Sequence, residues 1–290
     1  MVLISAVSML VFYLTCRTAG VMCCQFEGRI VAMSKMRLDL LMVEKGLAET
    51  RSKAQAIIMA GQVRVNGQMV DRAGVNLPAD AAVEVVAGPR FVSRGGEKLL
   101  AALEAFHLQP QGLVCADVGV STGGFSDCLL QHGAARIYAI DVGKGILHWK
   151  LRSDPRMVVM EETNARHVVT LPEPVGLVVC DASFISLKIL LPVFTRWLAE
   201  GANVITLIKP QFEAGRADVA RGEGVVRDPA IHRRVLEDVL DFAQKQGYAV
   251  RGLVRSPLLG PKGNVEFLAW LDRQASSSEI NALVDNALLI

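Results

Sequence analysis

The chain has 290 residues, of which 51% are hydrophobic and 21% charged; this suits one large and one small globular domain and excludes a disordered chain. Its 31 basic and 29 acidic residues leave a formal net charge of +2, so binding to a polyanion through overall charge is excluded and has to come from local patches. The six cysteines include no C-x-x-C pair, which excludes a disulfide framework or a structural zinc site and is typical of a reducing compartment.

The first 35 residues differ from the rest of the chain. Residues 2–16 form an apolar run that is too short for a comfortable membrane span. The run also lacks the basic residues that precede the apolar part of a secretory signal. A regular amphipathic pattern starts only at Met36. We therefore expect residues 1–35 to be a start-site artefact or a disordered extension, with a signal anchor as the weaker alternative.

Residues 36–87 have the pattern of a small α+β domain. The stretch "RLDLLMVEKG" predicts a helix that ends at Gly46, and "TRSKAQAIIMAG" predicts a second helix with Thr50 as its N-cap. The segment "QVRVNGQMV" alternates around Asn66 and Gly67, the strongest short signal for a β-hairpin. Ordinary solvated side chains and phosphate contacts both explain the basic residues nearby, which are Arg51, Lys53, Arg64 and Arg72.

The same stretch, "RLDLLMVEKGLAETRSKAQAIIMAGQVRVNGQMV", resembles the S4 RNA-binding module, an αL-type fold in which two helices and a hairpin hold structured RNA. The resemblance implies an RNA-binding domain over residues 36–87, followed by a linker over residues 88–92. The side chains expected to contact RNA are Arg37, Arg51, Lys53, Arg64 and, just after the linker, Arg94.

Residues 93–273 alternate apolar strands with helical patterns. This alternation predicts a doubly wound α/β domain, with a Rossmann-like parallel sheet and helices on both faces. The expected strands lie at 113–118, 136–141, 157–160, 176–181, 202–208, 248–255 and 264–271. Residues 274–290 are expected to form a short helical or frayed tail, to which we assign no role.

The first of these strands leads into a glycine-rich turn and a helix, in "LVCADVGVSTGGFSDCLL". Glycines let the backbone turn tightly and approach a ligand. The spacing D-x-G-x-x-x-G-G differs from that of dinucleotide sites, and no lysine follows as in nucleoside triphosphate sites. Asp117, at the strand end, could bind the ammonium group of a ligand that resembles an amino acid. The alternative is that the glycine-rich segment is only a tight structural turn. The cofactor-binding residues expected here are Asp117, Gly119, Ser121, Gly123, Gly124 and Phe125.

Two polar residues further along the chain suggest the same kind of ligand. Asp141 ends the second predicted strand, where an acidic residue commonly accepts hydrogen bonds from ribose hydroxyls. Asn164 follows the third strand, where an adenine edge would lie, although a plain turn residue explains it as well. With the glycine turn, these residues suggest S-adenosylmethionine, which carries an adenine, a ribose and an ammonium group.

Two lysines and two carboxylates are expected to converge on one pocket. Asp181 ends the fourth strand and Lys209 ends the fifth, which Pro210 then stops. Glu266 lies within the apolar strand "NVEFLAWL", where an unpaired carboxylate is costly. Lys98 begins the helix before the first strand. Each has an ordinary structural explanation, but together they suit methylation of a weakly acidic hydroxyl, with a lysine as proton acceptor.

The four residues match, in order and strand context, the lysine–aspartate–lysine–glutamate tetrad of the FtsJ-like ribose 2′-O-methyltransferases. With the N-terminal module, "VSRGGEKL", "DVGVSTGGF", "CDASFISL" and "IKPQFE" resemble the TlyA, or haemolysin-A-like, family over residues 36–272. The resemblance implies S-adenosylmethionine-dependent methylation of a ribosomal RNA ribose, at a cytidine. It implies Lys209 as the base, positioned by Lys98, Asp181 and Glu266, with Asp181 also near the cofactor.

It further implies ribosomal RNA or ribosomal subunits as partners in the cytoplasm, no obligatory membrane partner and no metal. Three alternatives stay open. Cytosine carbon methylation needs a cysteine nucleophile, but strand alternation directs Cys180 away from the Asp181 side chain and into the core. The function of a membrane-active haemolysin is supported only by the apolar N-terminus, and the function of a non-catalytic RNA-binding protein leaves the tetrad unexplained.

Residues 213–228 form a loop of the kind that often acts as a lid over an active site, and it contains Arg216, Arg221 and Arg227.

Overall fold

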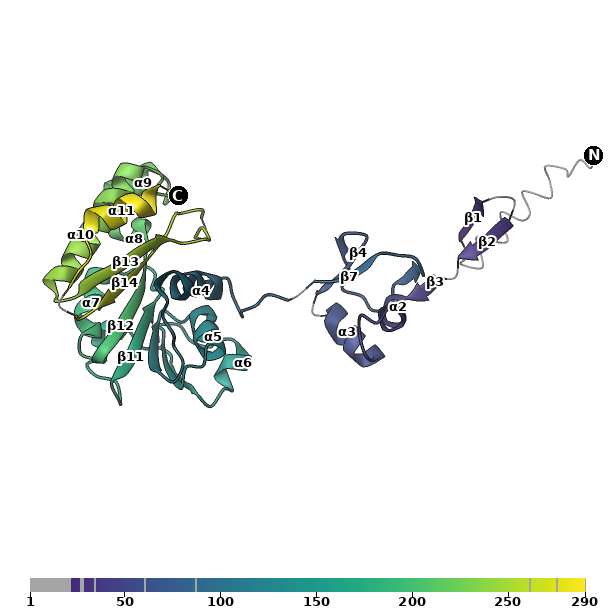
Figure 1. Cartoon of the computed structure of the whole chain (residues 1–290), viewed down its shortest axis with the longest axis horizontal. Coiled ribbons are helices and arrows are strands. Elements are labelled where there is room, and N and C mark those ends of the chain that lie inside the picture. The colour runs from purple at the N-terminus through teal and green to yellow at the C-terminus, as the bar shows by residue number, and fades with distance from the viewer. Residues whose placement is uncertain are drawn as a thin grey trace, which may run out of the picture. The chain divides into compact units, whose positions relative to one another are not determined.

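A computed structural model describes residues 22–26, 29–33, 35–59, 61–86, 88–260, 262–274 and 276–289 (Figure 1). The chain divides into two compact units, Met1–Gly88 and Pro89–Ile290. The first described residues form strands β1 (Met22–Phe26) and β2 (Arg29–Met33), which pair antiparallel. The apolar run of residues 2–16, on which the expectation of a start-site artefact rests, lies outside the described residues.

The small domain, residues 35–86, contains two helices and short strands. Its helices are α2 (Leu38–Glu44) and α3 (Arg51–Met59), and Lys53 N donates to Thr50 Oγ1 at 3.2 Å, which confirms the predicted N-cap. β4 (Val63–Val65) and β5 (Gln68–Met69) form the predicted hairpin, whose turn residues Asn66 and Gly67 have φ of 50° and 80°. β3 (Lys35–Arg37) pairs with β6 (Asn76–Pro78), and β4 with β7 (Val83–Val85).

The large domain is built on a seven-stranded sheet with the order β10-β9-β8-β11-β12-β14-β13. Its strands are β8 (Val114–Val118), β9 (Arg136–Ile140), β10 (Met157–Met160), β11 (Val175–Cys180), β12 (Leu198–Ile208), β13 (Ala249–Arg255) and β14 (Phe267–Asp272). All seven predicted strands are present, and the doubly wound α/β class is confirmed.

One strand does not follow the prediction of a parallel sheet. β14 pairs antiparallel with both β12 and β13. A parallel connection needs a crossover of a dozen or more residues, usually with a helix, whereas the described residues between β13 and β14 form no helix. β14 also begins at Phe267, so Glu266 lies just before this strand and not within it as predicted.

Helices cover both faces of the sheet (Figure 1). α7 (Leu187–Phe194), α10 (Pro229–Lys245) and α11 (Ile280–Leu288) pack on one face, while α4 (Gly95–Phe106), α5 (Gly124–Gln131) and α6 (Trp149–Arg152) pack on the other. The tail thus contributes a packed helix, α11. Cys180 is fully buried, as predicted, in the core between the sheet and α7, α10 and α11. Burial raises the pKa of its thiol to about 12. Among the described residues, no helix is both long and apolar enough to cross a membrane.

The order of strands reverses between β8 and β11. From β8 the chain builds outward through β9 to β10, and it then returns to β11 and β12 on the other side. In open α/β sheets, ligands bind beyond the carboxyl ends of the strands at such a switch point. The segments that follow β8, β9, β11 and β12 are therefore brought to one edge of the sheet.

Candidate active site

The glycine-rich turn between β8 and α5 packs closely against two neighbouring segments. Gly119 has φ of 80°, and a Cβ on it would lie 2.9 Å from the backbone of Ala182, the second residue after β11. A Cβ on Gly124 would lie 2.8 Å from Gly96 N, at the start of α4. Gly123, with φ of 97°, instead faces leucine side chains of the α6 region. Glycine is thus required here by backbone conformation and by close approach.

Two adjoining cavities of about 500 and 610 Å³ lie beside this turn. The first, called here the tetrad cavity, is lined by Lys98, Asp181, Lys209 and Glu266, and by the turn residues Gly119, Ser121, Gly124 and Phe125. The second, the Asp141 cavity, is lined by Gly119, Ser121, Asp141, Asn164 and Asp181. The structure therefore brings most predicted site residues to two cavities that share lining residues; Gly123 and Asp117 line neither.

Replacing Gly119 by alanine is expected to weaken cofactor binding and to destabilise the large domain. The new Cβ would meet the Ala182 backbone at 2.9 Å, and positive φ adds strain. Gly201 is the matched control, because its φ is 71° but a Cβ there meets nothing within 4 Å. We expect Gly119→Ala to cost more unfolding free energy than Gly201→Ala by about 1–3 kcal/mol in urea titrations. Equal costs for the two variants would show that the close approach is unimportant.

Asp117 is a fully buried carboxylate at the end of β8. Ser126 Oγ donates to its Oδ2 at 2.6 Å, whereas Oδ1 has no hydrogen-bond partner among the described residues. Burial raises the pKa of Asp117 to about 7, and the negative charges of Asp181 and Asp141 add to this effect. Asp117 is therefore a buried acceptor with unused hydrogen-bonding capacity.

Asp141 and Asn164 are held in place by backbone contacts. Asp141 Oδ2 accepts from Ser121 N at 2.8 Å, and its Oδ1 accepts from Gly143 N at 2.7 Å. The Asn164 side chain accepts from Arg166 N at 3.1 Å and caps the short helix η1 (Ala165–His167). Asn164 is thus a turn residue that also lines the Asp141 cavity.

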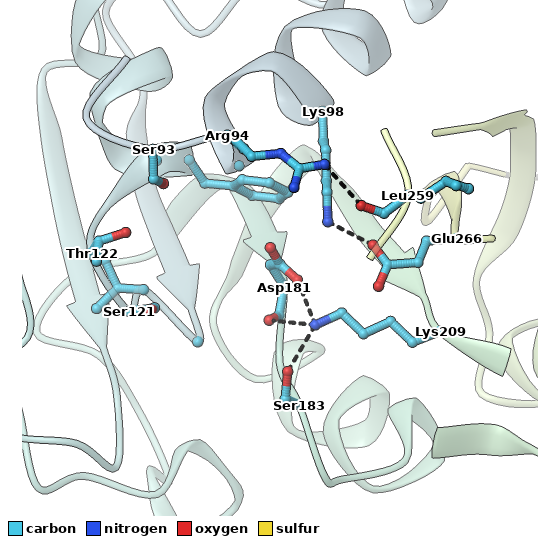
Figure 2. A pocket seen from close by; sticks show the side chains of 15 residues that line it. Ser93, Arg94, Lys98, Ser121, Thr122, Asp181, Ser183, Lys209, Leu259 and Glu266 are labelled. Carbon is cyan, nitrogen blue, oxygen red and sulfur yellow. Dashed lines mark hydrogen bonds and ion pairs between the residues drawn. The ribbon is translucent and has the colours of Figure 1, made fainter. Parts of the chain in front are cut away.

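Lys98 and Glu266 form a buried ion pair on one wall of the tetrad cavity (Figure 2). Lys98 Nζ lies 2.6 Å from Glu266 Oε2, and the side chains are only 9% and 1% exposed. Gln211 Nε2 makes a longer contact of 3.4 Å to Oε1 of the same carboxylate. Because removal of either charge leaves the other buried without compensation, the pair fixes the geometry of this wall.

Lys209 and Asp181 form the second ion pair, beside Ser183 (Figure 2). Lys209 directly follows β12, and Pro210 begins the short helix α8 (Pro210–Glu213). Lys209 Nζ lies 2.6 Å from Asp181 Oδ1 and donates to the Asp181 carbonyl oxygen at 3.1 Å and to Ser183 Oγ at 2.9 Å. The ammonium group is thus held by two hydrogen bonds and one ion-pair contact. The four predicted residues thus meet as two ion pairs.

Sequence reasoning did not identify Ser183 and Phe184, which follow Asp181. Phe184 is 90% exposed, its φ is 63°, and its ring centroid lies 4.9 Å from that of Phe212. A left-handed backbone is unusual for a bulky residue and indicates that the surrounding structure imposes it. The aromatic residue after a polar strand end, in "DASF", was the one available signal in the sequence.

In the small domain, Arg37 and Arg51 meet at one buried carboxylate. Asp39 is fully buried and accepts from Arg37 Nε and Nη2, each at 3.0 Å, from Arg51 Nε at 2.9 Å and from Gln55 Nε2 at 2.8 Å. The Arg37 guanidinium holds the pKa of Asp39 well below its usual range, with further help from Gln55 and Arg51. The two arginine side chains remain 42% and 52% exposed. Asp39 therefore orients two accessible guanidinium groups.

Replacing Asp39 by alanine is expected to destabilise the small domain by about 1–3 kcal/mol, because Arg37, Arg51 and Gln55 lose the buried acceptor that they share. The change should also lower RNA affinity, since Arg37 and Arg51 lose their common anchor. Asp71→Ala, at an exposed position, is the control. Chemical denaturation and RNA titration measure the two effects. Unchanged stability in Asp39→Ala would contradict this assignment.

The other basic residues that are expected to contact RNA, Lys53, Arg64 and Arg94, do not share a common partner among the described residues. Lys53 pairs with Glu49, and Arg64 is exposed on β4. Arg94 lines the tetrad cavity and donates from Nη2 to the Leu259 carbonyl oxygen at 3.1 Å. None of these contacts holds its guanidinium or ammonium group as firmly as Asp39 holds Arg37.

The loop predicted as a lid contains the helix α9 (Arg216–Arg221). At its start, Glu213 accepts from Ser186 Oγ at 2.6 Å and from Leu187 N at 2.7 Å, so it ties α8 to the N-terminus of α7. Burial raises the pKa of Glu213. Arg227 is exposed, while the side chains of Arg216 and Arg221 are not among those that the structure describes.

In the described parts of the chain, no three His, Cys, Asp or Glu side chains come together to hold a metal ion.

Comparisons with known proteins agree with this geometry. The S4 domain family matches residues 36–83, and the FtsJ-like methyltransferase family matches residues 91–273. The chain is 42% identical, over 264 residues, to the 16S/23S rRNA (cytidine-2′-O)-methyltransferase TlyA of Mycobacterium tuberculosis, covering 88% of this chain and 97% of that protein. It is 41% identical, over 237 residues, to Hemolysin A of Brachyspira hyodysenteriae, covering 81% and 98%.

A solved structure gives the same result. A Streptococcus thermophilus protein, provisionally labelled a hemolysin, is similar with a TM-score of 0.65 and 42% identity, over 88% of this chain and 96% of that one. The two family matches come in the same order along the chain as the small and large domains described above. The chain therefore belongs to the TlyA family, and its large domain is an FtsJ-like methyltransferase domain.

Proposed function

We propose that the protein transfers a methyl group from S-adenosylmethionine to a ribose 2′-hydroxyl of ribosomal RNA, at a cytidine, as the name of its Mycobacterium tuberculosis relative states for that enzyme. The observation that carries this proposal is the pairing of Lys98 with Glu266 and of Lys209 with Asp181 on the walls of one cavity beside the glycine turn. A methyl group on a sulfonium is already electrophilic, so the enzyme has to orient the hydroxyl and remove its proton.

The residues around the Asp141 cavity fit S-adenosylmethionine. Asp141 carboxylate oxygens have further lone pairs for ribose hydroxyls, and Asn164 offers an amide to the adenine edge. The backbone of Gly119 and Ser121 lines the same cavity. The unsatisfied Oδ1 of Asp117 has the chemistry to accept a hydrogen bond from the ammonium group. When bound, the cofactor supplies the methyl group.

The two ion pairs have different tasks in this reaction. Lys209 receives the ribose proton at Nζ, and Asp181, 2.6 Å away, holds the amine at the strand end. Lys98 places a positive charge on the facing wall, where it stabilises negative charge that develops on the ribose oxygen. Glu266 keeps Lys98 in position through the buried 2.6 Å contact.

Several surface features support RNA as the substrate. Arg37 and Arg51 present two oriented guanidinium groups, which suit phosphate contacts. Arg94 lies at the tetrad cavity, where a phosphate next to the target ribose would lie. Phe184 exposes an aromatic ring on which a nucleobase can stack. We place the reaction in the cytoplasm, in keeping with Cys115, Cys128 and Cys180, which are free, buried thiols among the described residues.

The test is a transfer assay with labelled S-adenosylmethionine and three acceptors: bacterial ribosomal subunits, free ribosomal RNA and transfer RNA. Label in ribosomal RNA, free or within subunits, is expected. An Arg37→Ala, Arg51→Ala double variant should need more RNA for the same rate, because phosphate contacts act mainly on affinity. Cofactor binding without transfer to any ribosomal form would favour a non-catalytic RNA-binding protein. Lysis of red cells by the purified protein, without transfer, would favour a membrane-active haemolysin.

A further inference from the structure

Ser183 lies where three cavities meet. It lines the tetrad cavity and the Asp141 cavity, and also a third cavity of about 420 Å³ whose walls include Phe184, Lys209 and Glu266. Among the described residues, Ser183 alone lines all three. If the cofactor occupies the Asp141 cavity and the ribose enters the tetrad cavity, the methyl donor and its acceptor meet at Ser183.

Ser183 differs from the other groups that contact Lys209, because it can donate a proton as well as accept a hydrogen bond. Asp181 offers Lys209 two acceptors, its Oδ1 at 2.6 Å and its carbonyl oxygen at 3.1 Å, and neither can donate a proton. Ser183 Oγ, 2.9 Å from Nζ, is a hydroxyl and can both accept and donate. Figure 2 shows all three contacts meeting at the Lys209 amine.

The same contacts direct the lone pair of a neutral Lys209. An unprotonated amine has two N–H donors and one lone pair. Nζ donates to the Asp181 carbonyl oxygen at 3.1 Å and lies 2.6 Å from Asp181 Oδ1 as an ion pair. With its two N–H groups turned toward these oxygens, a neutral amine has its lone pair left for Ser183 Oγ, 2.9 Å away. The Ser183 hydroxyl can then donate to Nζ while its oxygen still accepts a hydrogen bond from a second hydroxyl in the cavity.

We propose that Ser183 is a further catalytic residue, a hydroxyl that relays the ribose proton to Lys209; this inference rests on the proposed function. The O2′–H bond breaks as Ser183 Oγ takes that proton, while the Ser183 hydroxyl proton passes to the neutral Lys209 amine, which becomes an ammonium. The O2′ electron pair forms the new bond to the methyl carbon. The carbon–sulfur bond breaks with its electron pair left on sulfur, so the sulfonium becomes a thioether.

Single-turnover methyl transfer to bacterial ribosomal subunits tests the relay in the full chain. We expect Ser183→Ala to slow transfer by about tenfold or more, within the range of general acid–base effects, and Ser183→Thr, which keeps the hydroxyl, to retain most of the rate. Ser153→Ala removes a hydroxyl at the end of α6 and serves as control. Two readouts do not depend on turnover: calorimetric affinity for S-adenosylhomocysteine, and a crystal structure of Ser183→Ala. Both should match the parent protein, with Lys209 Nζ still at Asp181.

Each contrary outcome has a separate meaning. Ser183→Ala transferring at the parent rate would overturn the relay and leave the proposed function intact. Equal losses of rate in Ser183→Ala and Ser183→Thr would also overturn it, because the hydroxyl would then not account for the effect. A Lys209 side chain displaced from Asp181 in the crystal structure would overturn it too, because Ser183 would then act only by holding Lys209 in place. A parent protein that binds S-adenosylhomocysteine but transfers nothing to ribosomal subunits or free ribosomal RNA would overturn the proposed function, and the relay with it.

Discussion

Replacing Lys209 by alanine is expected to lower the rate of methyl transfer by about 10²- to 10⁴-fold, the usual contribution of a positioned proton acceptor. Cofactor affinity should stay close to that of the parent protein, because Lys209 lines the tetrad cavity and not the Asp141 cavity. Lys245→Ala, at an exposed lysine in the last turn of α10, is the matched control. Transfer of labelled methyl groups and calorimetric binding of S-adenosylhomocysteine measure the two quantities.

Lys209 is a better test of the chemistry than Lys98. Removal of Lys98 leaves Glu266, which is 1% exposed, as a buried charge without its partner, so loss of activity there is hard to separate from unfolding. Asp181 is 22% exposed, and water can hydrate it when Lys209 is absent. A Lys209→Ala protein that folds, binds cofactor and still methylates at the parent rate would rule out this lysine as the proton acceptor.

Replacing Asp117 by asparagine is expected to stabilise the large domain at neutral and alkaline pH. The pKa of Asp117 is raised from 3.8 in the unfolded chain to about 7 in the folded protein, chiefly by burial. The folded state therefore holds this proton to higher pH, and the stability that Asp117 contributes is complete below pH 3.8 and falls as pH rises toward 7. Asparagine, similar in shape to the neutral carboxyl, avoids this loss.

The expected stability difference between Asp117→Asn and the parent protein is small near pH 4 and grows to at most about 4 kcal/mol above pH 7. Urea titrations from pH 4 to pH 8 measure it, with Asp241→Asn, at an exposed position of α10, as the control. A stability difference that does not grow with pH would contradict a raised pKa for the buried Asp117 carboxyl group. If Asp117 accepts from the ammonium group of the cofactor, as proposed above, cofactor affinity should also fall in this variant.

The parts of the fold set by local patterns could be predicted from the sequence. Thr50 as an N-cap and Asn66–Gly67 as a hairpin turn follow from side-chain and backbone preferences within a few residues. The positions of Asp181 and Lys209 follow from the rule that parallel strands end at one edge of a sheet. The first two predictions needed only the local sequence, and the third needed only the fold class.

The features that were missed depend on contacts between distant segments. The reversed direction of β14 depends on which neighbours it pairs with, and a strand pattern does not contain that information. The left-handed backbone of Phe184 goes against the preference of a bulky residue, so propensity points away from it. Ser183 looks like an ordinary loop serine until β11 and β12 are placed side by side and Lys209 reaches it.

The position of the transferred methyl group tests the central claim most directly. Ribosomal RNA is treated with the protein and labelled S-adenosylmethionine, digested to nucleosides and separated by mass spectrometry. We expect the label on the ribose, in 2′-O-methylcytidine, and at least about a hundredfold less of it after the same time with Lys209→Ala. Label on a base, or no label in any ribosomal RNA while the cofactor is bound, would contradict ribose methylation by the Lys98–Glu266 and Lys209–Asp181 pairs.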